Sequence, residues 1–470
     1  MEKKTCIAMV PCPGLSHLIP LLEFAKRLIQ LDHNNNKFHV TFLIPTLGPP
    51  SSSMISFLND LPPNIDFNIL PQVNIEDVPH NLHPATKMRL VVKLSLPFLH
   101  EAVSSLMSSH THHLVALVLS MFSVDAIDVA KQFNLLSHVF FASGAVFLSF
   151  CLSMPKLDKS VFTDLTKTVN VPGCVVPFQV KELPDPVLYE KSSETFISFD
   201  GLCERLSFVD GVMVNSFKDL EGETIRAIEE ENGNSLCIYP VGPIIQTEST
   251  NKENQWECIE WLNNQPPKSV LYISFGSGGT LSQEQLNELA FGLELSGHRF
   301  LWVVRAPSNT PSSAYLAGQK EDPLNFLPCG FLERTKGHGL VVPSWAPQIE
   351  VLGHGSTGGF LSHCGWSSTL ESVVHGVPMI AWPLFAEQRM NAVTLTQVLK
   401  LAVRPKIDDE SGIIKREEIA KVIKRIMEGD EGLEIRTRIK ELSDAAGVAL
   451  SEHGSSHRAL SSVFMKWQNI

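Results

Sequence analysis

The segment from residue 345 to residue 388 is dense in side chains that could do chemistry. Its sequence is WAPQIEVLGHGSTGGFLSHCGWSSTLESVVHGVPMIAWPLFAEQ. Tryptophan faces could stack on a base, imidazole and hydroxyl groups could bind phosphates, and carboxylate and amide groups could bind sugar hydroxyls. This combination suits a nucleotide diphosphate that carries a sugar. The candidate binding residues are Trp345, Ala346, Gln348, His363, Trp366, Ser367, Ser368, Glu371, Trp382, Glu387 and Gln388.

A turn between a strand and a helix lies at the centre of this segment. HCGWSS (363–368) follows an apolar run at 358–362 that is typical of a strand, and it precedes a run at 367–376 with apolar residues at helical spacing. A helix start has free N–H groups and the positive end of the helix dipole, so it can bind an anion. Glu371, one turn further, could accept from ribose hydroxyls. The alternative is a capped helix in a buried α/β unit, with the tryptophans in its core.

His17 is the strongest catalytic candidate outside this segment. It lies in PCPGLSHLIP, where the chain leaves the first expected strand and opens the first expected helix. A neutral imidazole near pH 7 can act as a general base. The alternative is a histidine that caps the N-terminus of the helix.

Two glycine-rich segments bear on a rival dinucleotide-binding fold. GHGSTG (353–358) has the fingerprint spacing, but a helix-like run precedes it and a strand-like run follows, which reverses the required order. GSGGTL (276–281) follows a strand but lacks the third glycine. It is still a good tight turn against a phosphate, to which Ser277 could donate.

Two sets of alternating strands and helices must position these residues. Strand-like runs lie at 6–11, 39–45, 114–119, 138–143 and 211–216, and then at 269–275, 299–305, 339–343, 358–362 and 378–383. Helical patterns between several of them are typical of doubly wound parallel sheets. Ligands of such sheets bind at the carboxyl ends of the strands. We therefore expect two α/β domains with the active site in a cleft between them.

A polar segment, QTESTNKENQ (246–255), separates the two sets. We expect an N-terminal domain at 1–245, a linker at 246–256 and a second domain at 257–452 that contains the candidate nucleotide-sugar site.

Composition and charge disfavour several classes of protein. The 470 residues carry a formal net charge of −12 without a basic run, so we expect no nucleic-acid partner. The nine cysteines show no CxxC pair or zinc spacing, which favours reduced thiols in the cytoplasm. No secretory signal is evident. The apolar run at 135–154 is about long enough to span a bilayer. Ser143 and Gly144 divide it, so we expect a buried strand that feeds a helix, and no membrane span.

The 44 residues from 345 to 388 resemble the signature box of the plant secondary-product UDP-glycosyltransferases. The resemblance continues through AMVPCPGLSHLIPLLEFAKRL and SVLYISFGSGGTLS to nearly the whole chain, and it is to the subfamily that glucosylates small phenols such as hydroquinone. It implies the GT-B architecture, in which two Rossmann-like domains face each other across a cleft. It also implies that a last helix, at 453–470, crosses back to the first domain.

The resemblance further implies an inverting reaction. His17 matches the family's catalytic base, which takes the proton of a hydroxyl as its oxygen attacks the anomeric carbon of UDP-glucose. Attack from the face opposite UDP gives a β-glucoside. We expect UDP-glucose as co-substrate, no cofactor and a monomer. We also expect no metal, because the chain has no D-x-D motif and the helix start at 365–368 would supply the positive field.

Individual positions carry over from the family. Those for the uracil and ribose are Ala346 and Gln348. Those for the diphosphate are Ser277, His363 and Ser368. Those for the sugar are Trp382, Glu387 and Gln388. Gln388 could both donate and accept, and a glutamine at this position tends to accompany glucose. Met121, Phe122 and loops near 140–150 and 180–200 should form an apolar acceptor pocket for a small, flat aromatic compound.

Two positions depart from the family. Ser120 stands where the family has an aspartate that supports the catalytic histidine, so a charge that would stabilise the imidazolium is missing. Asp125 and Asp128 are close in sequence, but we do not expect Asp125 to reach His17. Ser367 replaces an asparagine, which offers more hydrogen-bond donors. The loss of one such bond would cost about 0.5–1.5 kcal/mol of donor binding.

These departures leave three hypotheses open. The first is glucosylation of a phenolic hydroxyl that needs little help to ionise. The second is glucosylation at nitrogen or carbon by the same fold. The third is a protein that binds UDP-sugar with weak turnover.

Overall fold

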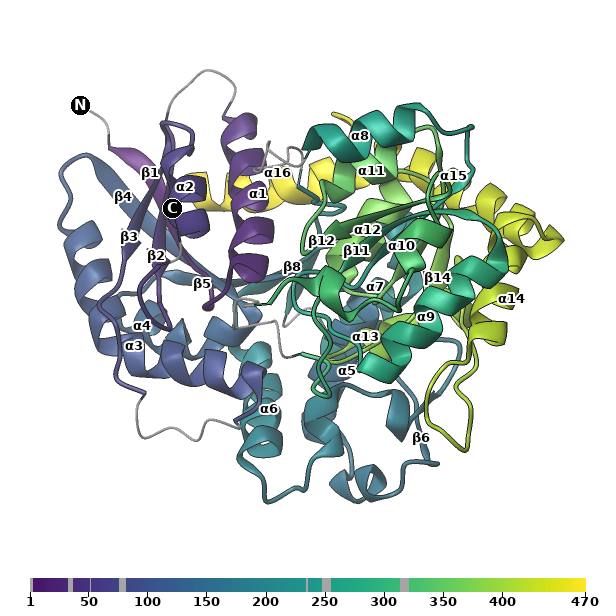
Figure 1. The fold of residues 1–470 in the computed structure, drawn as a ribbon. Helices are drawn as coiled ribbons and strands as arrows, with labels where there is room; N and C mark the ends of the chain where they lie inside the picture. Colours follow the sequence, from purple (N-terminus) through teal and green to yellow (C-terminus); the bar gives the residue numbers. More distant parts are fainter. Residues whose placement is uncertain are drawn as a thin grey trace. The chain divides into compact units, whose positions relative to one another are not determined.

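The computed structural model describes residues 3–32, 37–50, 52–75, 82–233, 236–246, 255–312 and 321–470. The described chain forms two compact units, which are considered separately (Figure 1). Unit 1 takes the chain up to Lys181, then Pro186–Ile245 and Val448–Ile470, and unit 2 takes Glu182–Asp185 and Gln246–Gly447. Most of the expected linker, residues 247–254, lies outside the described residues.

Unit 1 contains a seven-stranded parallel sheet in the order β3-β2-β1-β4-β5-β8-β9. Its core strands are buried along nearly their whole length, which explains why apolar residues dominate their sequences. The strands are β1 (Lys4–Val10), β2 (Phe38–Ile44), β3 (Ile65–Ile69), β4 (His112–Ser120), β5 (Leu136–Phe141), β8 (Gly211–Val214) and β9 (Cys237–Pro240), and a small antiparallel pair adds β6 (Thr168–Val169) and β7 (Phe178–Gln179).

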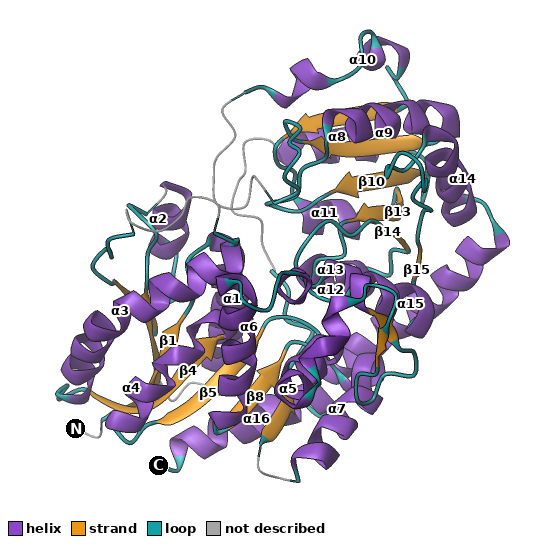
Figure 2. Ribbon diagram, turned by 90° about the horizontal axis from the view of Figure 1, so that it is seen from below, coloured by secondary structure: helices purple, strands orange, loops and turns teal. Residues whose placement is uncertain are grey.

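Helices pack against this sheet and against one another (Figure 2). They are α1 (Leu15–Leu31), α2 (Ser52–Asn59), α3 (Pro84–Met107), α4 (Ile127–Gln132), α5 (Ala145–Ser153), α6 (Glu194–Arg205), α7 (Lys218–Asn232) and, from the end of the chain, α16 (Ser455–Gln468). Helix α16 packs beside α1 and β9 (Figure 1). The ring of Phe38 lies 4.7 Å from that of Phe464 and 6.4 Å from that of Trp467, so the last helix completes the core of unit 1.

Unit 2 contains a six-stranded parallel sheet in the order β12-β11-β10-β13-β14-β15. The strands are β10 (Val270–Ser274), β11 (Arg299–Val304), β12 (Gly339–Pro343), β13 (Thr357–Ser362), β14 (Met379–Ala381) and β15 (Ala402–Val403). The helices are α8 (Gln255–Asn263), α9 (Gln283–Ser296), α10 (Phe331–Arg334), α11 (Gln348–Gly353), α12 (Trp366–Val374), α13 (Gln388–Val393), α14 (Arg416–Met427) and α15 (Asp430–Leu450), which continues into unit 1.

The ten strand-like runs of the sequence all form strands, and the expectation of parallel α/β architecture is confirmed. The fingerprint-like segment at 353–358 joins the end of α11 to the start of β13, so its context is indeed the reverse of a dinucleotide site. The apolar run at 135–154 forms β5 and α5, and every residue of α5 is buried.

One helix of the described chain, α3, is long and apolar enough to cross a membrane by length and composition. Core helices pass the same test, so this is weak evidence for a span. Within α3, Arg89 is buried in an ion pair with Asp125, and the helix packs against α6.

Candidate functional site

The expected turn at 363–368 has the geometry that an anion site requires. Strand β13 ends at Ser362, and α12 begins at Trp366. Gly365 occupies the N-cap position and provides no side chain to cap the helix. The N–H groups in the first turn of a helix have no partner within the helix, so they are suited to bind an anion.

The imidazole of His363 lies between two glycines that permit its position. A Cβ atom on Gly276 or on Gly365 would come within 2.5 Å of His363 Nε2. Nδ1 of His363 is buried and has no hydrogen-bond partner in the described part of the chain. Burial, with a smaller effect of the Arg305 charge, lowers the pKa of His363 to about 4. The ring is therefore neutral near pH 7 and carries one N–H that can donate.

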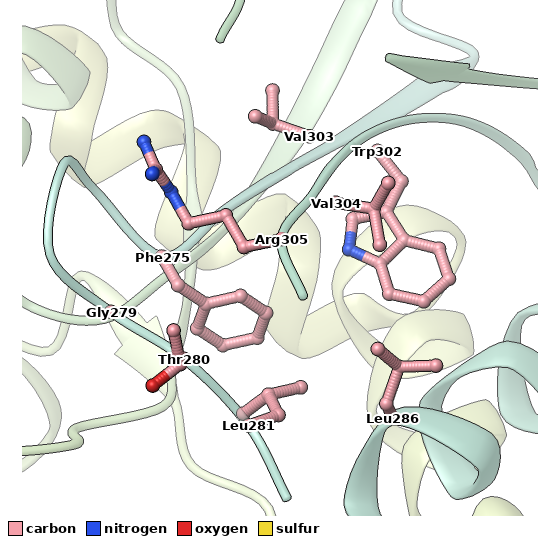
Figure 3. A pocket seen from close by; sticks show the side chains of 9 residues that line it. All are labelled: Phe275, Gly279, Thr280, Leu281, Leu286, Trp302, Val303, Val304 and Arg305. Carbon is pink, nitrogen blue, oxygen red and sulfur yellow. The ribbon is translucent and has the colours of Figure 1, made fainter. Parts of the chain in front are cut away.

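Arg305 is a residue of this region that sequence reasoning missed. Its Nε–H donates to the carbonyl of Gly276 at 3.2 Å. Arg305, Leu281 and Trp302 line a small pocket of about 10 Å³. Figure 3 shows the guanidinium of Arg305 directed away from the apolar side chains of Leu281 and Trp302. The sequence could have indicated Arg305, because it is a cationic residue directly after strand β11, where ligands of such sheets bind.

Three predicted donor residues meet in one polar network. Nε2 of Gln348 donates to Ser368 Oγ at 2.8 Å and to Glu371 Oε2 at 2.5 Å. The hydroxyl of Tyr272 donates to Gln348 Oε1 at 3.3 Å. Burial raises the pKa of Glu371 to about 7, against the opposing effect of the Gln348 hydrogen bond. The structure thus joins the start of α11 to the first two turns of α12.

The predicted tryptophans occupy two kinds of environment. Trp345 is partly exposed just before α11, next to the buried Ala346. Trp366 and Trp382 are each only 3% exposed. The ring of Trp382 packs edge to face against Phe275 at 5.9 Å. The alternative of tryptophans in the core therefore applies to these two residues.

The expectation that Gln388 could both donate and accept needs correction. Its Oε1 accepts from the backbone N–H groups of Leu384 at 2.9 Å and Phe385 at 3.0 Å. An amide oxygen has two lone pairs, so only the NH₂ group of Gln388 remains for a ligand. Glu387, at the N-cap of α13, is partly buried. Ser277 is exposed after β10, and Ser367 is half-buried in the first turn of α12.

His17 lies in the first turn of α1, after β1 ends at Val10. The ring of Phe122 meets its imidazole edge to face, with centroids 5.5 Å apart. Burial lowers the pKa of His17 to about 4, so the neutral form that a base requires prevails near pH 7. Phe122 and Met121 begin the short helix at Met121–Ala126, and both are half-buried.

Ser120 ends β4 and is 7% exposed. Its hydroxyl lies 2.9 Å from that of Ser123 and hydrogen-bonds the thiol of Cys12. The carboxylate of Asp125 accepts from Arg89 at 2.7 and 3.0 Å, and Arg205 approaches it to 3.1 Å. Asp125 is therefore paired with two guanidinium groups, of which that of Arg205 also pairs with Asp128.

Comparisons with known proteins identify the family. The profile of the UDP-glucoronosyl and UDP-glucosyl transferase family matches residues 244–430. Hydroquinone glucosyltransferase from Rauvolfia serpentina is 48% identical over an alignment of 474 positions, which covers 100% of this chain and 99% of that protein. UDP-glycosyltransferase 72B1 from Arabidopsis thaliana is 45% identical over 99% of this chain and 97% of its own length. The chain belongs to the plant UDP-glycosyltransferases.

Solved structures of plant UDP-glycosyltransferases share the fold. A UDP-glucosyltransferase from Polygonum tinctorium capable of glucosylating indoxyl, in complex with 3,4-dichloroaniline, is 46% identical, with a TM-score of 0.90 over 99% of both chains. UGT2 from Phytolacca americana, in complex with UDP-2fluoro-glucose and pterostilbene, is 43% identical, with a TM-score of 0.89 over 99% of this chain and 100% of that one. This UDP-glycosyltransferase is therefore a transferase of the GT-B fold.

The described ranges of this UDP-glycosyltransferase contain no group of three or more His, Cys, Asp or Glu side chains arranged to hold a metal ion. All nine cysteines are free thiols.

Proposed function

We propose that this UDP-glycosyltransferase transfers glucose from UDP-glucose to the hydroxyl of a small phenol and yields a β-glucoside. The observation that carries the proposal is the neutral imidazole of His17 beside the aromatic ring of Phe122. The similarity to a hydroquinone glucosyltransferase supports a phenolic acceptor.

Unit 2 supplies the donor site in this proposal. The uracil stacks on Trp345, and Gln348 and Glu371 hold the ribose. The first turn of α12, with Ser367, binds the diphosphate. His363, Ser277 and Ser368 add polar groups there, and Glu387 and the NH₂ group of Gln388 face the glucose. We propose that no metal is needed, because the helix start supplies positive potential to the leaving diphosphate.

Unit 1 supplies the base. In the reacting complex, the imidazole of His17 takes the phenolic proton while the phenolic oxygen bonds to the anomeric carbon. The bond from that carbon to the β-phosphate oxygen breaks, and UDP leaves with the electron pair. The attacking oxygen enters opposite the leaving group, so the configuration inverts.

The low pKa of His17 determines which acceptors suit the enzyme. A phenol has a pKa of about 10, so full proton transfer to a base with a pKa of about 4 is strongly uphill. Proton transfer must therefore accompany bond formation, which acidifies the attacking oxygen. Ser120 provides no carboxylate to stabilise the imidazolium, so more acidic acceptors such as chlorinated phenols and enols should react faster.

Glucosylation at nitrogen is the second candidate. A neutral aniline attacks with a free lone pair and needs no proton removed beforehand, so a weak base suffices. The structural relative that binds 3,4-dichloroaniline favours this possibility.

An assay of UDP release tests the proposal with phenols of graded acidity and with anilines. We expect turnover that rises as the phenol becomes more acidic. His17→Gln should lower turnover of phenols by at least about 100-fold, the usual scale of general-base catalysis, and should leave the calorimetric Kd of UDP unchanged. Binding of UDP without turnover of any acceptor would support the third hypothesis, a binding protein. Absence of UDP binding would contradict the proposal altogether.

A further inference from the structure

A distant part of the chain holds the turn that carries Glu387 and Gln388. Asp185 lies 201 residues before Ala386 in sequence. It belongs to the short segment Glu182–Asp185, which is part of unit 2 although the chain on both sides is part of unit 1. The backbone N–H of Ala386 donates to Asp185 Oδ2 at 2.5 Å, and the backbone N–H of Asp185 donates to the carbonyl of Ala386 at 3.2 Å. The two residues therefore bind each other in both directions.

Arg389 makes a further contact with the same carboxylate. Its guanidinium forms an ion pair with Asp185 Oδ1. The two side chains are 22% and 18% exposed, so solvent screens the pair only in part, and charge-assisted hydrogen bonds of this kind are strong. Asp185 thus holds the chain at Ala386, just before Glu387 and Gln388, and again at Arg389, just after them.

The backbone conformations at Ala386 and Asp185 are consistent with a rigid contact, here called the clamp of Asp185 on Ala386. Ala386 has a φ of 55°, in the left-handed region that residues other than glycine rarely adopt without support. Asp185 lies between Pro184 and Pro186, whose rings fix their own backbone φ angles. A carboxylate on a stiff segment therefore stabilises an unfavourable turn.

We propose that Asp185 is a positioning residue for recognition of the donor sugar. It fixes the turn from which Glu387 and the NH₂ group of Gln388 reach the hexose hydroxyls. The inference rests on the proposed function, which assigns the glucose to these residues. Asp185 has no role in the inferred sites for uracil, ribose and diphosphate, because those sites are built from Ser277 and from residues 345–371. Its removal should therefore affect the hexose and spare the nucleotide.

Calorimetry without acceptor tests the inference on the full-length protein. The Kd values of UDP and of UDP-glucose are measured for the wild type, Asp185→Ala and Glu182→Gln. We expect Asp185→Ala to weaken UDP-glucose binding by about tenfold, the scale of a lost charge-assisted bond, and to leave the Kd of UDP unchanged. The KM for UDP-glucose should rise in parallel.

Glu182→Gln is the matched control, since Glu182 lies in the same segment but pairs with Arg404. It should leave both Kd values unchanged. Asp185→Asn keeps an acceptor for the N–H group of Ala386 but loses the charge that faces Arg389. Its Kd for UDP-glucose should therefore lie between those of the wild type and Asp185→Ala.

An unchanged Kd of UDP also shows that the variant is folded. Equal weakening of UDP and UDP-glucose in Asp185→Ala, or no weakening of either, would overturn the inference and leave the proposed function intact. Failure of the wild type to bind UDP would overturn the proposed function itself.

Discussion

The rings of His17 and Phe122 lie edge to face, with an interplanar angle of 88°. The two residues follow β1 and β4, which are neighbours in the sheet of unit 1. Such aromatic contacts contribute about 0.5–1.5 kcal/mol beyond area burial, enough to favour one orientation of the imidazole. In the proposed mechanism, this contact orients the His17 imidazole, to which Ser120 offers no carboxylate.

Ser120→Asp should move the acid limb of the pH–rate profile upward. In the wild type, the limb of kcat/KM should lie near the His17 pKa of about 4, because the protonated imidazole cannot act as base. A nearby carboxylate favours the imidazolium and so raises this pKa. We expect faster glucosylation of weakly acidic phenols at pH 7. Ser120→Asn has similar size without the charge and should leave the limb in place. An unchanged or slower rate for Ser120→Asp would show that His17 does not depend on this position.

Ser367→Asn should tighten donor binding. Ser367 lies in the first turn of α12, and an asparagine reaches further and offers more donors. One added hydrogen bond of about 0.5–1.5 kcal/mol corresponds to a Kd for UDP lowered by about two- to tenfold. Calorimetry with UDP measures the change directly. A weaker Kd would mean that this position does not face the diphosphate.

Glu371→Gln should change how stability depends on pH. The pKa of Glu371 is about 7 in the folded protein, against an ordinary value of 4.5 for a glutamate side chain, so the folded protein binds more protons than the unfolded chain between these values. As pH rises through this window, the carboxyl ionises in the unfolded chain but stays largely protonated in the folded protein, so the wild type loses at most about 1.4 kcal/mol of stability per pH unit. The glutamine does not titrate, so the stability of the variant relative to the wild type should rise between about pH 4.5 and about pH 7 and then level off.

Urea unfolding at several pH values measures that difference in the free energy of unfolding. Glu333→Gln, at an exposed position in α10, serves as control and should show no such trend. An equal pH dependence of the free energy of unfolding in the wild type and in Glu371→Gln would contradict the raised pKa of Glu371.

Trp467→Ala should destabilise unit 1 strongly. Trp467 has no exposed surface, stacks near Phe38, and its Nε1–H donates to His138 Nδ1 at 3.4 Å. Truncation of such a side chain typically costs about 3–5 kcal/mol. Met465→Ala on the same helix, at a position 53% exposed, should change stability by less than about 0.5 kcal/mol. Denaturant unfolding measures the loss of stability in each variant. Similar losses in Trp467→Ala and Met465→Ala would argue against the packing of α16 into the core of unit 1.

Much of the fold could be predicted because the apolar pattern repeats locally. Long, largely buried strands such as β2 and β4 are rich in apolar residues, and α1 shows buried Leu18, Leu21 and Leu28 at helical spacing. The edge strand β3 was not predicted, because its sequence IDFNI is mostly exposed. Strands β9 and β15 were not predicted either, because they are too short to show a pattern.

The candidate site was predictable where it depends on neighbours in sequence. The turn before α12 and the proximity of Ser368 to Glu371 follow from a single strand and helix. The clamp of Asp185 on Ala386 does not, because it joins residues 201 positions apart. The orientation of Gln388 depends on a local fold of the backbone, and its amide oxygen is bound by N–H groups that the side-chain pattern does not reveal.

Unit 1 is completed by the last segment of the chain, which has a consequence for biosynthesis. The apolar side chains of α16, which include Val463 and Phe464, belong to the same core as β1 and β2. A ribosome produces those strands first and α16 last, after all of unit 2. Until α16 has been synthesised, the part of the N-terminal sheet's apolar surface that α16 covers therefore stays exposed. Unit 2 can finish folding before unit 1, against the usual order in which the N-terminal domain matures first.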